Sequence, residues 1–220
     1  SGQAITIAAA AGGTPTLKIA TVFETSGRFG AVTGDTGSAT VVYGEDGVKY
    51  ATGATSGSYV VRRLKQSENA DWDATLSNSL FSILVGITAN GTDHQIYFGT
   101  SNGVSAGAAA LTGLSLDQYG FKNIRAASVS TFSATNGNGT TETTTAITAL
   151  TASSDFNLLA QKTGTTNVRY YRNRTLEATH TTNLPNNAMS DVCTFAITNA
   201  NTASNSAIQF SSFCFEQDAQ

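Results

Sequence analysis

The sequence predicts an all-β, antiparallel sandwich, and three observations support that prediction. Short runs with alternating side chains recur about every ten residues, residues that favour turns separate them, and no helical spacing extends beyond two turns. The strongest run extends from Val168 to Pro185, where two alternating segments flank a polar turn at Asn173-Arg174. This arrangement is typical of a β-hairpin.

The chain is predicted to begin with an N-terminal strand extension ahead of the sandwich. Residues 3–9 alternate around Ile5 and Ile7, and a Gly-Gly pair and a proline then interrupt the pattern. We therefore divide the chain into an N-terminal strand with its linker, residues 1–15, and a single sandwich domain, residues 16–220. A chain of 220 residues is long enough to bury a substantial core without metals or several disulfides.

The strands of the sandwich are expected where alternating or apolar runs lie between turn signals. They are residues 17–23, 28–33, 39–43, 48–52, 59–64, 76–88, 94–99, 121–129, 144–150, 155–161, 168–172, 176–181, 192–198 and 207–216. Run 76–88 is the most apolar, and its β-branched residues favour a strand over a short helix. Strand 94–99 is expected to pair with it. Residues 101–116 are expected to form a long loop, with one helical turn near residues 114–119.

The composition restricts the classes of partner. Charged residues make up 12% of the chain, against roughly 25% in ordinary soluble domains, so hydroxyls and amides must form most of the surface. The net charge of −3 provides no basic footprint for nucleic acid. No apolar run approaches the roughly 20 residues that cross a bilayer. We expect neither nucleic-acid binding nor a membrane span.

Other features suit an extracellular protein. Lysine is scarce, threonine and asparagine are abundant, and three Asn-x-Thr sequons begin at Asn90, Asn138 and Asn173. Sequons also arise by chance in a composition of this kind. We treat the three as glycosylation candidates and expect the protein to be extracellular or on a virion surface.

Four segments near the C-terminus share a strand-and-corner pattern. They are residues 155–161, 168–173, 179–185 and 207–215. The pattern resembles the last strands of concanavalin A-like jelly rolls, a superfamily that includes lectins, laminin-G-like modules, glucanases and phage structural domains. A strand of this kind there usually turns at Asn-Gly, whereas Arg174 replaces the glycine here. The resemblance implies a jelly-roll β-sandwich and supports the fold better than any function.

The enzyme hypothesis was tested on the motif of the jelly-roll glucanases, Glu-x-Asp-x-x-Glu on one strand, where alternation places the carboxylates on one face of the sheet. Residues 68–73 have the wrong spacing, and residues 216–218 contain only half of the motif. His94 and His180 lie in no recognisable Ser or Cys elbow, so each is expected to be an ordinary polar residue on a strand. We therefore expect no enzymatic activity.

No cofactor is expected, with calcium left open. Two histidines and two distant cysteines lack the clustered spacing of a zinc site. Many proteins of the resembled superfamily bind calcium through loop carboxylates and carbonyls. The candidate oxygen ligands are Asp35, Glu45, Asp46, Asp71 and Asp73.

Cys193 and Cys214 are a disulfide candidate. If the last two strands form a hairpin centred near Ala203, these cysteines stand opposite each other with their side chains on one face. A bond there would close a loop of about 20 residues and contribute around 3 kcal/mol in an oxidising compartment. The alternatives are two buried free thiols, or two strands that lie in different sheets.

Two functions fit the predicted fold. In the first, the chain is a structural subunit of an extracellular filament or virion surface, and the strand with Ile5 and Ile7 adds to the open sheet edge of a neighbouring copy. Alternatively, that strand pairs within its own domain. A surface low in charge and rich in threonine favours assembly. We therefore expect a non-enzymatic structural protein whose partners are copies of itself.

In the second function, which is the alternative, the chain is a carbohydrate-binding module. Sugar faces stack on aromatic rings, and sugar hydroxyls need directed polar partners. The candidates are Trp72 with Asp71, and Tyr171 near Asn173. One tyrosine of the pair at 170–171 must face inward by alternation, and a lone tryptophan can equally anchor a core or a loop.

Overall fold

A computed structural model of the chain describes residues 37–44, 47–65, 78–104, 111–151, 154–187, 189, 191–199 and 203–217. At residues 43–44, 63–65, 191–192 and 213–217 it describes the backbone alone. The predicted strands before residue 37, and with them the division at residue 15, lie outside the described residues and stay predictions. In the described part no helix is long and apolar enough to cross a membrane.

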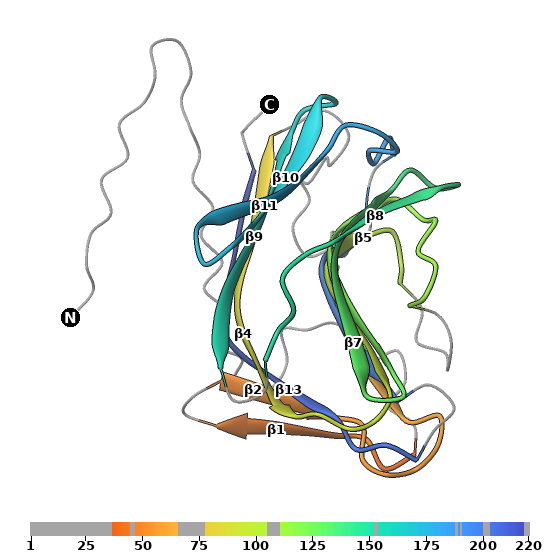
Figure 1. Ribbon diagram of the computed structural model, residues 1–220. Coiled ribbons are helices and arrows are strands. Elements are labelled where there is room, and N and C mark those ends of the chain that lie inside the picture. Colours follow the sequence, from red (N-terminus) through yellow and green to blue (C-terminus); the bar gives the residue numbers. More distant parts are fainter. Residues whose placement is uncertain are drawn as a thin grey trace, which may run out of the picture.

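The described strands form two antiparallel sheets, packed face to face (Figure 1). The seven-stranded sheet has the order β1 (Thr40–Gly44), β2 (Gly47–Ala51), β13 (Ala207–Gln217), β4 (Ser79–Ala89), β9 (Asp155–Thr163), β10 (Asn167–Arg172) and β11 (Thr175–His180). The six-stranded sheet has the order β3 (Tyr59–Lys65), β12 (Asp191–Thr198), β5 (His94–Ser101), β6 (Gln118–Ala126), β7 (Val129–Gly137) and β8 (Glu142–Ala146). The predicted antiparallel sandwich is confirmed.

Alternation along each strand builds the core between the two sheets. On β4 the side chains of Phe81, Ile83 and Val85 are buried, and those between them are half-buried on the other face. Aromatic rings fill the centre: Phe121 and Phe132 stack with centroids 5.8 Å apart, and Tyr170 of the opposite sheet meets Phe121 edge-on at 5.6 Å. Such ring pairs contribute beyond the area that they bury.

The predicted pairing of strand 76–88 with strand 94–99 is wrong, and the alternative that the last two strands lie in different sheets is confirmed, because the connections cross between the sheets. β4 pairs with β13 and β9 in the seven-stranded sheet, whereas β5 pairs with β12 and β6 in the six-stranded sheet. β12 and β13 are divided in the same way. Stacked sheets lie roughly 10 Å apart, a gap that four extended residues are long enough to bridge. The turn at residues 90–93 therefore joins layers and does not close a hairpin.

The hairpin on which the predicted disulfide rests therefore does not form. Cys193 is buried and packs in the core between the sheets. The side chain of Cys214 lies outside the described residues, and its backbone pairs with Ser82 of β4. The Cys193–Cys214 bond stays a prediction, but the hairpin that would place the two cysteines opposite each other no longer supports it.

Residues 121–129, predicted as one strand, contain the end of β6 and a tight turn into β7. Ala127 and Ser128 have φ values of 46° and 68°. A two-residue hairpin turn of this type needs positive φ at both central positions, where glycine or asparagine is usual. The predicted helical turn near residues 114–119 is also wrong, because Gln118 begins β6.

The hairpin predicted from residue 168 onward is confirmed as β10 and β11. Asn173 and Arg174 form its turn with φ values of 50° and 70°. The turn also docks on β9, because Asn173 Oδ1 accepts a hydrogen bond from Asn157 N at 2.9 Å and Asn173 N donates to Asn157 O at 2.7 Å. A bulge at Tyr170 and Tyr171 shifts the register within the hairpin.

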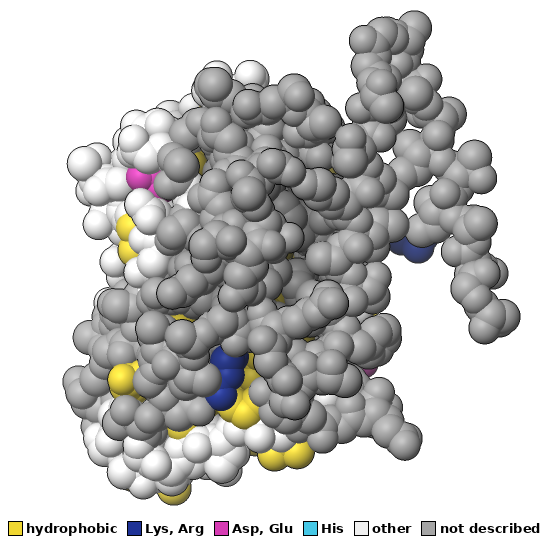
Figure 2. Space-filling view, turned by 180° about the vertical axis from the view of Figure 1, so that it is seen from behind, with side chains coloured by type: hydrophobic (Ala, Val, Ile, Leu, Met, Phe, Trp, Pro, Cys, Tyr) yellow, Lys and Arg dark blue, Asp and Glu magenta, His cyan; other side chains and the backbone are white. Residues whose placement is uncertain are grey.

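The described part of the surface is low in charge, as the composition predicts. Figure 2 shows the molecule from behind, and among the described residues the charged side chains visible there are few and well separated. Neutral side chains and backbone make up most of the surface of the described residues in that view.

Candidate functional site

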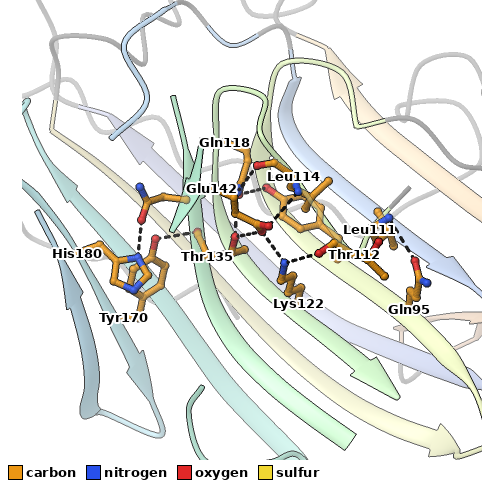
Figure 3. A network of polar contacts seen from close by, with 12 residues as sticks. Gln95, Leu111, Thr112, Leu114, Gln118, Lys122, Thr135, Glu142, Tyr170 and His180 are labelled. Atoms are coloured by element: carbon orange, nitrogen blue, oxygen red, sulfur yellow. Dashed lines mark hydrogen bonds and ion pairs between the residues drawn. The ribbon is translucent and has the colours of Figure 1, made fainter. Parts of the chain in front are cut away.

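A buried ion pair lies on the outer face of the six-stranded sheet, which is turned away from the other sheet (Figure 3). Lys122 of β6 places Nζ 2.6 Å from Oε1 of Glu142 on β8, and the two side chains are 6% and 13% exposed. Thr135, on β7 between these strands, donates its hydroxyl to the same carboxylate oxygen at 2.6 Å. Gln118 donates in turn to the Thr135 hydroxyl at 2.9 Å.

A segment between β5 and β6 covers this polar face. We call residues 111–117 the strap. Its main chain forms hydrogen bonds with four side chains of the sheet: Leu111 N donates to Gln95 at 3.2 Å, Leu114 N to Glu142 at 3.0 Å, Lys122 to Thr112 O at 3.3 Å, and Gln118 to Leu114 O at 3.4 Å. In Figure 3, contacts from Gln95 on β5, from Gln118 and Lys122 on β6 and from Glu142 on β8 lead to the strap.

Apolar contacts and an aspartate fix the strap further. Leu111 and Leu114 are buried in a small cluster with Tyr97 and other residues of this face. At the strap's end, the Asp117 carboxylate accepts hydrogen bonds from the backbone N of Asn186 and Asn187 at 2.9 and 3.2 Å. The strap is thus tied both to the sheet and to the segment after β11.

Two paired glycines make room for an aromatic ring on the same face. Gly99 and Gly120 stand opposite each other on β5 and β6. A Cβ on Gly99 would lie 2.7 Å from the Tyr97 hydroxyl oxygen, which donates to Thr100 O at 2.8 Å. The tyrosine therefore reaches over the glycine pair, as aromatic residues do elsewhere in sheets.

The outer face of the six-stranded sheet is closed beneath the strap, over β5 and β6. Gln95, Tyr97, Gln118 and Lys122 are all buried, and each has hydrogen bonds to main-chain groups. A ligand would have to displace the strap to reach them.

On the outer face of the seven-stranded sheet, strands β9 to β11 carry exposed side chains, among them Asn157, Arg169 and Leu176. Tyr170 points into the core and is fully buried, whereas Tyr171 is half-buried on the outer face. The predicted inward orientation of one tyrosine is thus confirmed. Tyr171 pairs with Leu159 of β9 and Leu176 of β11, so that three apolar side chains form a row across the strands.

Polar side chains surround this row. Arg169 and Asn173 lie two residues before and after Tyr171, and both are exposed. Asn157 and Gln161 of β9 lie on the diagonals, because Leu159 between them is the direct partner. We call Tyr171 with Arg169, Asn157, Gln161 and Leu176 the Tyr171 patch. It presents one ring and several donors and acceptors to solvent.

The two histidines lie on strands, as predicted, but both are buried between the sheets. His94 begins β5 with Nδ1 2.9 Å from Ser206 Oγ. His180 ends β11, contacts Asn136 of β7 through Nδ1, and lies 2.9 Å from Thr145 Oγ1 of β8 through Nε2. Burial lowers the pKa of each imidazole to about 4.

Several predicted site residues fall outside the described residues. They are the assembly residues Ile5 and Ile7, the glycan candidates Trp72 and Asp71, and the calcium candidates Asp35, Glu45, Asp46 and Asp73. Strand addition, the Trp72 site and calcium binding stay predictions. In the described part of the chain no three His, Cys, Asp or Glu side chains are grouped to hold a metal ion.

The three sequons occupy different surroundings. Asn90 is exposed after β4, and Asn173 is exposed in the β10–β11 turn. Asn138 is half-buried, and its Oδ1 accepts hydrogen bonds from Thr140 N and Thr141 N at 3.1 and 2.9 Å. Their glycosylation stays a prediction.

Solved structures share this architecture. An alginate lyase, Aly36B, superposes with a TM-score of 0.59 at 12% identity, over 85% of this chain and 86% of its own. The carbohydrate recognition domain of Emp47p gives a TM-score of 0.56 at 9% identity, over 84% and 87%. The fold is that of the concanavalin A-like jelly rolls. This confirms the fold implied by the sequence resemblance, and at these identities it shows the fold alone.

A third jelly roll of this kind is the endo-β-1,4-glucuronan lyase of the fungus Trichoderma reesei, with a TM-score of 0.54 at 10% identity, over 86% of this chain and 90% of its own. Neither a protein-family model nor a curated protein sequence matches the chain.

The prediction that the chain is not an enzyme is corrected by these structures. Two of the three are lyases, so a jelly roll of this shape gives no ground for excluding catalysis. The motif tested in the sequence belongs to glucanases and does not bear on lyases. A carbohydrate recognition domain is about as similar, so the fold does not assign a lyase activity either.

The ion pair Lys122–Glu142 and the strap were not found in the sequence. Lys122 and Glu142 are 20 positions apart in the sequence. They come together because β6 and β8 flank β7 in the same sheet. A usable signal was present, because each is a lone charge in an otherwise uncharged part of its strand.

Proposed function

We propose that this jelly roll binds carbohydrate and that the Tyr171 patch is its binding surface. The observation behind the proposal is the contrast between the two outer faces. On the six-stranded sheet the polar side chains bind the strap, whereas on the seven-stranded sheet a half-exposed ring is surrounded by a guanidinium and amides.

The chemistry of the patch suits a sugar. The apolar face of a pyranose stacks on an aromatic ring, and its hydroxyls take directed hydrogen bonds from amides and arginine. Tyr171 supplies the ring, Leu159 and Leu176 extend the apolar row, and Arg169, Asn157 and Gln161 supply polar groups at its margins. Arg169 adds one positive charge, which favours glycans that carry carboxylate or sulfate.

The structural comparisons support the class of ligand. The three solved structures are named as a carbohydrate recognition domain, an alginate lyase and a glucuronan lyase. Fold likeness at about 10% identity does not transfer a site, so the patch is argued from its own residues.

A glycan array tests the proposal. The native chain is expected to bind a subset of glycans, and Tyr171→Ala is expected to weaken that binding about tenfold or more through loss of stacking. Arg169→Ala should weaken the binding of acidic glycans more than the binding of neutral glycans.

Tyr59→Ala is the matched control, because Tyr59 is also half-buried but lies on the six-stranded sheet. Binding by the native chain that survives both patch substitutions would place the site elsewhere. Absence of binding to every glycan on the array would reject carbohydrate binding itself.

A further inference from the structure

The two histidines of the chain each connect one sheet to the other. His94 belongs to the six-stranded sheet, and its partner Ser206 directly precedes β13 of the seven-stranded sheet. His180 belongs to the seven-stranded sheet, and its partners Asn136 and Thr145 belong to the six-stranded sheet. We call these two sets of contacts the His94 clasp and the His180 clasp.

The clasps lie toward opposite ends of the six-stranded sheet. Asn136 pairs with Tyr119, and Tyr119 pairs with Thr100 at the far end of β5. Thr100 is six residues from His94, which corresponds to roughly 20 Å along an extended strand. Each clasp therefore holds the sheets together at its own end.

The hydrogen bonds fix the tautomer of His180. Asn136 Nδ2 donates to Thr182 O and Asn183 O, so its Oδ1 faces the imidazole. Nδ1 of His180 must then carry the proton and donate to that oxygen. Nε2 is the acceptor, and the Thr145 hydroxyl donates to it at 2.9 Å. Both nitrogens are satisfied in the neutral form. A second proton on Nε2 would require the Thr145 hydroxyl to turn and accept, and it would place a positive charge in the buried space between the sheets.

His94 has even less room for a positive charge. It is fully buried, and its Nε2 has no hydrogen-bond partner among the described residues. Ser206 Oγ already accepts from Gly91 N at 3.0 Å. Arg125 stands opposite His94 on β6, and its charge opposes protonation.

Few other charges face the clasps in the described part of the chain. Asp93 adjoins His94 and favours its protonated form, less strongly than burial and Arg125 oppose it. Near His180, β7 has no charged side chain, and Glu142 of β8 lies on the opposite face, held by Lys122. Glu177 of β11 pairs with Arg172 at 3.1 Å.

We propose that His94 and His180 make the sandwich acid-sensitive: the neutral imidazoles hold the two sheets together, and protonation releases each clasp and opens the sandwich at that end. This goes beyond carbohydrate binding, because the clasps lie between the sheets and the Tyr171 patch lies on an outer face.

The direction of the pH effect follows from the shifted pKa values. Each folded-state pKa is about 4, below the value of 6.5 for an unperturbed imidazole. The stabilisation is complete above about pH 6.5 and is lost as the pH falls toward 4, because the open form binds more protons in that window. Between pH 7 and pH 4.5, opening at each clasp should increase at least about tenfold.

Hydrogen–deuterium exchange at pH 7 and pH 4.5, corrected for intrinsic rates, tests the proposal. In the native chain, segments 142–146 and 175–183 at the His180 clasp should lose about tenfold protection at pH 4.5, while segment 81–87 in β4 keeps its protection. In His180→Asn, where the amide replaces Nδ1 as donor, protection at the His180 clasp should be the same at both pH values. The His94 clasp should still respond.

Two results would overturn the inference. One is a loss of protection that is equal in all strands of the native chain. The other is an unchanged acid response in His180→Asn. If that variant does not fold, a proton NMR titration of the native imidazoles replaces it, and ring pKa values at or above 6.5 would contradict the proposal.

Discussion

Lys122 Nζ lies 2.6 Å from Glu142 Oε1 on the outer face of the six-stranded sheet, with little solvent on either side chain. The same carboxylate accepts a hydrogen bond from the backbone N–H of Leu114, and the same ammonium donates a hydrogen bond to Thr112 O. One ion pair thus joins β6, β8 and the strap. Two charges withdrawn from water in this way depend on each other, because either one alone would be buried without compensation.

Glu142→Gln should destabilise the chain by about 3 kcal/mol, because it leaves the Lys122 charge buried and unpaired. Urea unfolding measures the loss. Lys122→Met combined with Glu142→Leu should recover only part of it, because no charge then remains buried but Leu114 N and Thr112 O lose their hydrogen bonds to the pair. If Glu142→Gln were as stable as the native chain, the ion pair would not hold the strap.

Gly99→Ala should destabilise the chain by about 2 kcal/mol or more, because the added Cβ would lie 2.4 Å from the carbonyl oxygen of Tyr119. Gly113→Ala in the strap is the matched control, since a Cβ there meets nothing within 4 Å. Thermal unfolding of the two variants should differ by several degrees. Equal melting temperatures would contradict the close approach of β5 and β6.

Arg174→Gly should stabilise the chain by about 0.5–1 kcal/mol, because Arg174 has a φ of 70° that a glycine adopts without strain. Arg169→Gly, on the adjacent strand with ordinary backbone geometry, should destabilise it instead. Denaturant midpoints for the pair provide the comparison. Loss of stability in Arg174→Gly would mean that the turn does not form as described.

Strand positions could be predicted where alternation and turn residues agree. The β10–β11 hairpin is such a case, since buried Val168 and Tyr170 alternate with more exposed neighbours. The β6–β7 turn could not be predicted, because Ala127 and Ser128 take positive φ values without the glycine or asparagine that usually indicates them. The strand after it, β7, consists mostly of serine, threonine and alanine and has little apolar periodicity.

Pairing partners could not be predicted from spacing along the chain. A short connection can close a hairpin or step to the other sheet, and the residues of the connection after β4 do not distinguish the two. Tyr171 could be identified as a candidate because alternation places one of two adjacent tyrosines outside. The ion pair and the histidine contacts depend on strand order, which only the structure provides.

Chemical-shift mapping of the amide resonances during titration with an array-selected glycan shows which outer face of the sandwich binds the sugar. If the Tyr171 patch binds the sugar, the largest shifts fall on Tyr171, Arg169, Asn157 and their neighbours on β9 to β11, with the strap resonances unchanged. Shifts concentrated instead on Leu111, Leu114 and Lys122 would contradict it, because they would place the sugar on the outer face of the six-stranded sheet with the strap displaced.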